Sequence, residues 1–164
     1  MVSTHLRLLY YFWYKFIVMA KAIDVANVFL RLSQPEVGDT ISNLKLQKLL
    51  YYAQGFHLAM NDGNPLFDEN ITAWAYGPVV ESVYRDFKQY GSGAIPVPED
   101  IDTSMFSKDQ LELIEEIYEV YGQFSALRLM QLTHSEKPWM ETSRDSIISR
   151  EVMRDFFITR INAN

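Results

Sequence analysis

The chain has 164 residues, of which 48% are apolar and 14% aromatic, a globular composition that excludes disordered and low-complexity classes. It contains no cysteine, which excludes disulfides, thiol catalysis and thiolate metal sites and favours a reducing, cytoplasmic compartment. Its 15 basic and 21 acidic residues give a net charge of −6, which argues against nucleic acid as the main ligand and suits a basic protein partner better. The acidic stretch Asp109–Glu119 is expected to be either a solvated helix face or a surface that steers such a partner.

The first eighteen residues differ in composition from the rest of the chain. Six aromatic residues fall within Tyr10–Phe16, and Arg7 and Lys15 are the charged residues before Met19. A signal peptide, an additional helix or arm, and an in-frame extension upstream of a start at Met19 are the open interpretations. A membrane span is excluded because it needs about 20 apolar residues. We expect the extension, and therefore divide the chain into residues 1–18 and a single domain at residues 19–164.

The apolar periodicity predicts a mainly α fold, a single compact domain of about six helices with one short β-hairpin or strand. Apolar residues on both sides of the second helix predict that it is central, with Thr40 or Ser42 as its N-cap. Gly55 within that helix predicts the close approach of another backbone. The connection Gly91–Phe106 exceeds the usual length of about 4–6 residues, so it is either functional or mobile. In chain order the expected elements are helices at about 21–32 and 43–60, a strand within 71–76 that can pair with 66–67, and helices at 78–90, 107–121, 125–134 and 149–161, with Pro138-Trp139 in a loop.

The histidines are weak candidates for catalysis. Metal or triad chemistry would have to use His57 and His134 with scattered carboxylates, and the chain has no metalloprotease, phosphate-loop, serine-hydrolase or calcium-loop motif. His57 shares a helix side with apolar residues and is expected to be structural. His134 is expected either to hydrogen-bond a carbonyl at a helix end or to lie on a binding surface. We predict no enzyme activity, cofactor or metal site, and keep a hydrolase that uses His57 and His134 as an alternative.

Large aromatic residues near turns are the stronger candidates. Trp74 and Tyr76 precede a Gly-Pro pair, and Trp139 follows a proline. Such residues either fill the core or anchor a partner, because interface hot spots favour Trp and Tyr. We take Trp74, Tyr76, His134 and Trp139 as candidate partner-binding residues, supported by the loop Gly91–Phe106.

Several separated segments resemble, in order and spacing, the SocA-like antitoxin family, also called Panacea, which includes phage-associated proteins. The likeness covers about residues 20–157. The segments that carry it include LKLQKLLYYAQG at Leu44–Gly55, PLF at Pro65–Phe67, AWAYGPVV at Ala73–Val80, LTH at Leu132–His134 and Pro138-Trp139.

The resemblance implies a mainly helical fold and a role as the antitoxin of a bacterial or phage toxin–antitoxin pair. Such an antitoxin binds its cognate protein toxin, which is expected to be encoded next to it. Some relatives act as adaptors that deliver the toxin to an ATP-dependent protease, and this is the alternative function. Nothing in the chain is long enough to be the additional helix-turn-helix domain of other variants. We therefore expect no direct contact with nucleic acid and none with a membrane.

Overall fold

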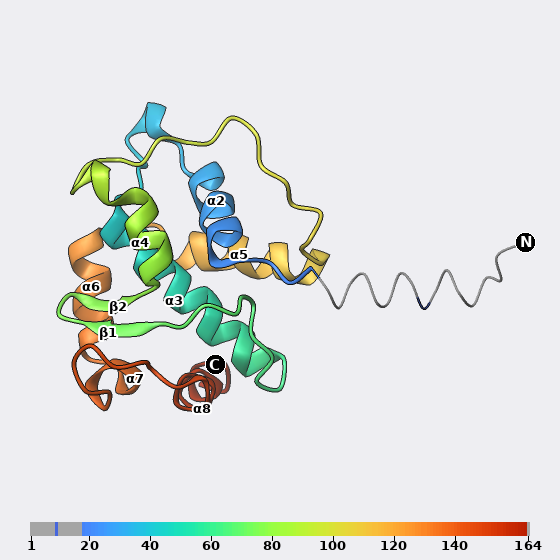
Figure 1. Cartoon of the computed structure of the whole chain (residues 1–164), viewed down its shortest axis with the longest axis vertical. Coiled ribbons are helices and arrows are strands. Elements are labelled where there is room, and N and C mark those ends of the chain that lie inside the picture. The colour runs from blue at the N-terminus through green and yellow to red at the C-terminus, as the bar shows by residue number, and fades with distance from the viewer. Residues whose placement is uncertain (1–8, 10–17, 164) are drawn as a thin grey trace, which may run out of the picture.

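The structure is a computed structural model that describes Leu9 and residues 18–163. Apart from Leu9 and Val18, the segment 1–18 lies outside the described residues, and so does the expectation that it is an extension upstream of the domain. The architecture is mainly α with one two-stranded sheet, which confirms the predicted fold class (Figure 1). The elements are α2 (Ala22–Leu32), η1 (Pro35–Val37), α3 (Asn43–Met60), β1 (Thr72–Trp74), β2 (Gly77–Val79), α4 (Glu81–Phe87), η2 (Lys88–Tyr90), α5 (Lys108–Tyr121), α6 (Ala126–His134), α7 (Lys137–Met140) and α8 (Arg150–Ile161).

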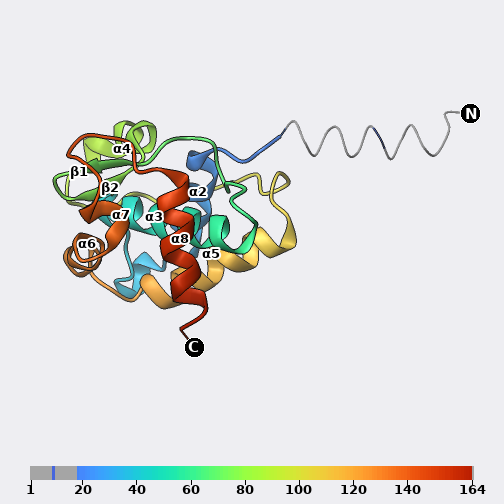
Figure 2. The ribbon, with the colours of Figure 1, turned by 90° about the horizontal axis from the view of Figure 1, so that it is seen from below.

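Helix α3 lies at the centre of the molecule, as its two apolar sides predicted. Its N-cap is Ser42, whose hydroxyl accepts a hydrogen bond from the Lys45 backbone N–H at 3.3 Å. Helices α2, α4, α5, α6 and α8 all pack against it, and two views at right angles show it surrounded (Figures 1 and 2). Nearly every residue of α3 is therefore buried, including its polar ones.

Gly55 is a site of close approach to α3, but the neighbour is a side chain and not the predicted backbone. The ring of Phe157 on α8 covers this glycine, and a Cβ placed on Gly55 would lie 2.0 Å from Phe157 Cε2. The missing side chain lets α8 pack tightly on α3, so that Phe157 is fully buried.

The hairpin pairs β1 with β2 in antiparallel register, with Thr72 opposite Val79 and Trp74 opposite Gly77. The predicted pairing with Leu66–Phe67 is wrong. Those two residues are held instead by the side chain of Gln54, which accepts from the Leu66 N–H and donates to the Phe67 carbonyl, both at 2.7 Å. The buried Gln54 amide on α3 therefore makes the hydrogen bonds to these backbone groups that a neighbouring strand would otherwise make.

The predicted helix start at Gly77-Pro78 is also wrong, because these residues form β2 and α4 begins at Glu81. The extended conformation is held from α3: Lys48 Nζ donates to the Pro78 carbonyl at 3.0 Å, and Gln47 Oε1 accepts from the Val80 N–H at 2.9 Å. Proline is tolerated here because β2 is an edge strand.

The later helices begin close to the predicted residues because each has a local cap. The hydroxyls of Ser107, Ser125 and Ser149 accept hydrogen bonds from backbone N–H groups in the first turns of α5, α6 and α8. Pro138-Trp139 lies in the short helix α7 and not in the predicted loop, since proline fits the first helical turn. Among the residues that the structure describes, no helix has the length and apolarity required to cross a bilayer.

Candidate partner-binding surface

The turn of the hairpin presents Tyr76 to solvent with 68% of its surface exposed. The following residue, Gly77, has φ +101°, a conformation that side-chain-bearing residues rarely adopt. A Cβ on Gly77 would lie 2.8 Å from both Lys48 Cε and Thr133 Oγ1. The turn is therefore seated against α3 and α6, and Tyr76 projects from a backbone that is held from behind.

Three of the four candidate residues form one contact cluster beside this turn. Trp139 Nε1 donates to the Trp74 carbonyl at 2.9 Å, and the His134 ring stacks on the Trp139 ring with centroids 4.0 Å apart. Trp74 also meets the ring of Tyr84 edge to face at 5.0 Å. All three candidates are half-buried, so each packs inside the fold while keeping part of its surface in solvent. We call the hairpin turn and this cluster the aromatic surface.

Two basic groups, Lys48 and His134, lie at the back of the aromatic surface. Lys48 is fully buried, and its burial lowers the pKa of its ammonium group to about 7. The pKa of His134 is lowered by burial first and by the charges of Lys48 and Arg144, while a backbone contact with Ala75 opposes the shift. His134 Nε2 is buried and has no hydrogen-bond partner among the described residues. At neutral pH the His134 ring is therefore an uncharged stacking partner for Trp139.

A buried carboxylate holds α7, and with it Trp139, in position. Glu136 accepts hydrogen bonds from the hydroxyls of Tyr51 at 3.0 Å and Tyr52 at 2.9 Å. Burial raises the pKa of Glu136, and the two tyrosine hydrogen bonds oppose the shift. The ring of Tyr52 in turn stacks on Tyr121 of α5 at 3.8 Å. Sequence reasoning missed Glu136, because nothing in the sequence around it indicates two partners more than eighty residues away.

His57 lies elsewhere, between α3, the turn that follows it and α5. Its Nδ1 is 2.9 Å from the Asn64 carbonyl and its Nε2 is 3.4 Å from Gln110 Nε2. Because a carbonyl only accepts, Nδ1 carries the proton and Nε2 is the acceptor. His134 lies beside Lys48, and Lys48 and His57 are separated by roughly 13 Å along the axis of α3 at 1.5 Å per residue. The structure does not bring the two histidines into one site.

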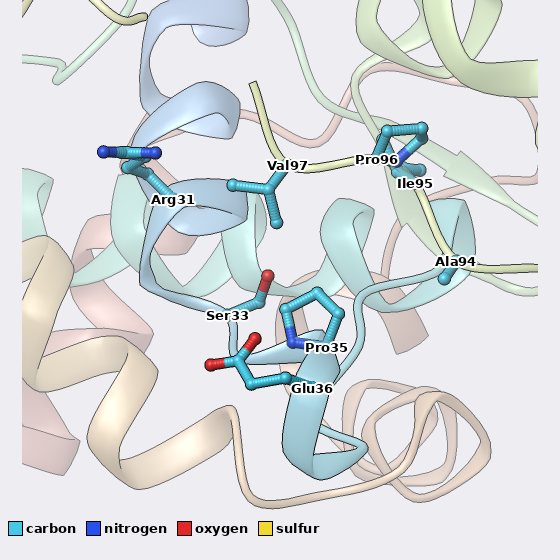
Figure 3. Close-up of a pocket in the computed structure, with 8 residues that line it drawn as sticks. All are labelled: Arg31, Ser33, Pro35, Glu36, Ala94, Ile95, Pro96 and Val97. Atoms are coloured by element: carbon cyan, nitrogen blue, oxygen red, sulfur yellow. The ribbon is translucent and has the colours of Figure 1, made fainter. Parts of the chain in front are cut away.

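The described residues contain no group of three or more histidine or acidic side chains arranged to hold a metal ion. The loop Gly91–Phe106 also lies apart from the aromatic surface. It runs over α2 and η1, where the Ile95 N–H donates to the Ile41 carbonyl at 2.9 Å. There it closes a pocket in which Val97 faces Ser33 (Figure 3). The loop was expected to support the four candidate residues, but its contacts are with α2, η1 and the residues beside them.

One exposed residue beside the hairpin was missed by sequence reasoning. The segment that precedes α8 lies along the free edge of β1, with the Ala73 N–H donating to the Ser146 carbonyl at 2.9 Å. It forms a bridge between Thr72 and Ile147, and 56% of the Ile147 surface is exposed. No periodicity surrounds this isoleucine, so the sequence carried no signal that it lies beside the hairpin.

The sequence profile described as Antitoxin SocA-like, Panacea domain, matches residues 46–140, more than half of the chain. The chain belongs to this family. The matched range runs from the first turn of α3 to the end of α7, and so includes the whole aromatic surface, whereas Ile147 and its segment lie outside the range.

This Panacea domain is also similar to the protein named Antitoxin SocA from Caulobacter vibrioides (strain NA1000 / CB15N). The two are 37% identical over 110 residues, which is 60% of this chain and 58% of the relative. The match thus spans a little more than half the length of the relative. No solved structure matches the chain.

Most side chains in the family-like segments of this Panacea domain make internal contacts. On α3, Lys48 holds β2, Gln54 holds residues 66–67, and Tyr51 and Tyr52 hold Glu136. These side chains stabilise the fold through contacts inside the domain. Tyr76 differs from them, because 68% of its surface is exposed.

Proposed function

We propose that this Panacea domain is an antitoxin that neutralises a cognate protein toxin by binding it directly, with Tyr76 as the central contact. Family membership and the similarity to Antitoxin SocA support the antitoxin role. The observation that carries the choice of surface is the exposed Tyr76 ring on a turn that Lys48 and Thr133 hold from behind. We expect the partner to be encoded by an adjacent gene and to meet the domain in the cytoplasm.

The physical argument concerns the entropy lost on binding. An aromatic side chain has few rotatable bonds, and a turn that is already held in place loses little conformational freedom when a partner docks. Tyr76 can therefore contribute most of its contact energy to affinity, as hot-spot tyrosines do. The half-buried rings of Trp74 and Trp139, which are joined by the hydrogen bond from Trp139 to the Trp74 carbonyl, supply apolar surface beside the turn. The negative net charge favours the approach of a basic toxin.

The first experiment expresses the product of the adjacent reading frame alone and together with the full chain. Growth should stop in the first case and recover in the second, and the two proteins should co-purify. A harmless neighbouring product, or a toxic one that does not bind the chain, contradicts the proposal. The half-life of the toxin should be unchanged by the chain; a half-life that falls only when an ATP-dependent protease is active would favour the adaptor alternative instead.

The second experiment tests the aromatic surface with Tyr76→Ala. Loss of a hot-spot tyrosine costs about 2 kcal/mol or more, so the affinity for the toxin should fall at least roughly thirtyfold. Tyr90→Ala is the matched control, because Tyr90 is also an exposed tyrosine but lies on η2, outside the aromatic surface. Its affinity should stay within about twofold of the wild type. Full affinity in Tyr76→Ala would remove the aromatic surface from the proposal.

A further inference from the structure

A groove lies between the C-terminal end of α3 and the N-terminal half of α5. These two helix segments lie on the side of the molecule away from the hairpin (Figures 1 and 2). It encloses about 760 Å³. Its apolar lining includes Met19, Met60 and Met105, and Met60 keeps 59% and Met19 44% of its surface exposed. These side chains give the groove apolar surface on which apolar groups of a ligand can pack.

One wall of the groove is acidic. Asp109, Glu112 and Glu116 line it, and their spacing of three and four residues places them on one stripe of α5 about 10 Å long. Lys108 pairs with Glu112 at 3.4 Å, so the three carboxylates of the wall keep a net negative charge beside this one ammonium group. Among the described residues no lysine or arginine lines the groove.

We propose that this groove binds a basic, apolar segment of the protein partner, with lysine or arginine side chains against the α5 wall and large apolar side chains on the methionines. The three carboxylates make a cationic segment the complementary occupant, and they disfavour an acidic one. Methionine side chains are flexible and polarisable, and they adapt to apolar groups of different shape. The inference rests on the proposed function for the identity of the partner, and the groove is a contact separate from the aromatic surface.

The groove can be tested without the toxin by using probe peptides. A fluorescently labelled peptide of about four helical turns, with leucines on one face and lysines on the other, should bind the full chain at low salt. The same peptide with glutamates in place of the lysines should not bind. Equal binding of the two peptides would contradict the charge complementarity on which the inference depends.

A matched pair of variants locates the binding. Glu112→Lys/Glu116→Lys reverses two charges on the groove wall, whereas Glu115→Lys/Glu119→Lys reverses two exposed charges on the same helix outside it. The two variants have the same net charge and the same spacing, so a difference between them reports the position of the reversed charges; Glu112→Lys also removes the exposed pair with Lys108, which contributes little. The groove variant should bind the lysine peptide and the toxin about tenfold more weakly than the control variant. Met60→Lys, at an exposed position, should have the same effect if the groove variant folds poorly.

Each outcome distinguishes the groove from the proposed function. A harmless neighbouring product ends the proposed function, while the peptide measurements still test the groove. Equal affinities in the groove and control variants overturn the inference and leave the aromatic surface standing. If light scattering instead shows that the groove variant separates a dimer into monomers with no change in peptide binding, the groove is a contact between copies of this chain and the inference is again overturned.

Discussion

Replacing Gly55 with alanine should destabilise the domain through a single contact. A Cβ at this position would lie 2.0, 2.2 and 2.6 Å from three ring atoms of Phe157, whereas ordinary contacts are 3.4 Å or longer. The ring must therefore move by more than roughly 1 Å in a close-packed interior. The ring is fully buried, and its centroid lies 5.4 Å from that of Tyr51 and 4.8 Å from that of Phe56, so a shift of the ring disturbs other packed side chains.

Two opposing effects set the magnitude. Overpacking of a rigid core costs about 3 kcal/mol, the upper end of the usual range, because the overlap is severe. Alanine in place of glycine inside a helix returns about 1 kcal/mol of helix propensity. The expected net loss for Gly55→Ala is about 2 kcal/mol, which corresponds to a fall in Tm of about 4–8 °C for a domain of this size. Urea unfolding followed by circular dichroism measures the loss directly.

A double-mutant cycle tests whether Phe157 is the cause. Phe157→Val removes all three ring atoms that the new Cβ would meet, at its own cost of a few kcal/mol. In that background Gly55→Ala should become neutral or stabilising by about 1 kcal/mol, because only the propensity effect is left. The same loss in both backgrounds, or no loss in the wild type, would show that Gly55 is not required for the approach of α8.

Three further predictions follow from other contacts. Gly77→Ala should lower the free energy of unfolding by at least about 2 kcal/mol more than Gly38→Ala, as measured in urea. Both glycines have positive φ, but only a Cβ on Gly77 would meet Lys48 and Thr133. Equal losses in the two variants would show that backbone strain alone is responsible and that the contacts with Lys48 and Thr133 add nothing. Tyr52→Phe should cost about 1–3 kcal/mol, since it removes one of two hydrogen bonds to the buried Glu136 carboxylate, and an unchanged urea midpoint would contradict this role. Burial lowers the pKa of His57 in the folded domain, so protonation of this residue favours the unfolded chain. The contribution of His57 to stability is therefore complete above pH 6.5, and it is lost as the pH falls toward the lower pKa of the folded state. His57→Gln should therefore lose less stability than the wild type between pH 7.5 and 5.5, and equal losses would exclude this titration.

The buried polar residues of α3 lie in a segment that resembles the family, and their side chains hold other segments of the fold in place. Lysine and glutamine side chains are expensive to bury, yet Gln47, Lys48 and Gln54 are among the least exposed residues of the chain. Each donates to or accepts from the backbone of a segment that has little regular structure of its own. They hold the hairpin and residues 66–67 on the central helix, and through β2 they support the turn that presents Tyr76.

The sequence by itself determined the features that depend on neighbouring residues. The central helix begins where predicted because Ser42 caps its start. It ends where predicted because a turn-rich segment, Asn61–Pro65, follows it. The serine caps of α5, α6 and α8 are equally local. The choice of Trp74, Tyr76, His134 and Trp139 also came from the sequence, as large aromatic or histidine side chains beside turn and proline signals. Their selection as partner-binding residues stays a prediction.

Only the tertiary structure decided how these pieces meet. The Trp139 ring donates a hydrogen bond to the Trp74 carbonyl, 65 positions away in the sequence. Tyr51 and Tyr52 donate to Glu136, which is 85 and 84 positions away. Gly77-Pro78 has a local preference for opening a helix, but Lys48 and Gln47 hold its surroundings extended. A local pattern reports the preference of a few residues. Here the buried hydrogen bonds from a distant helix override that preference, and leaving one of these buried polar groups unpaired would cost about 1–3 kcal/mol.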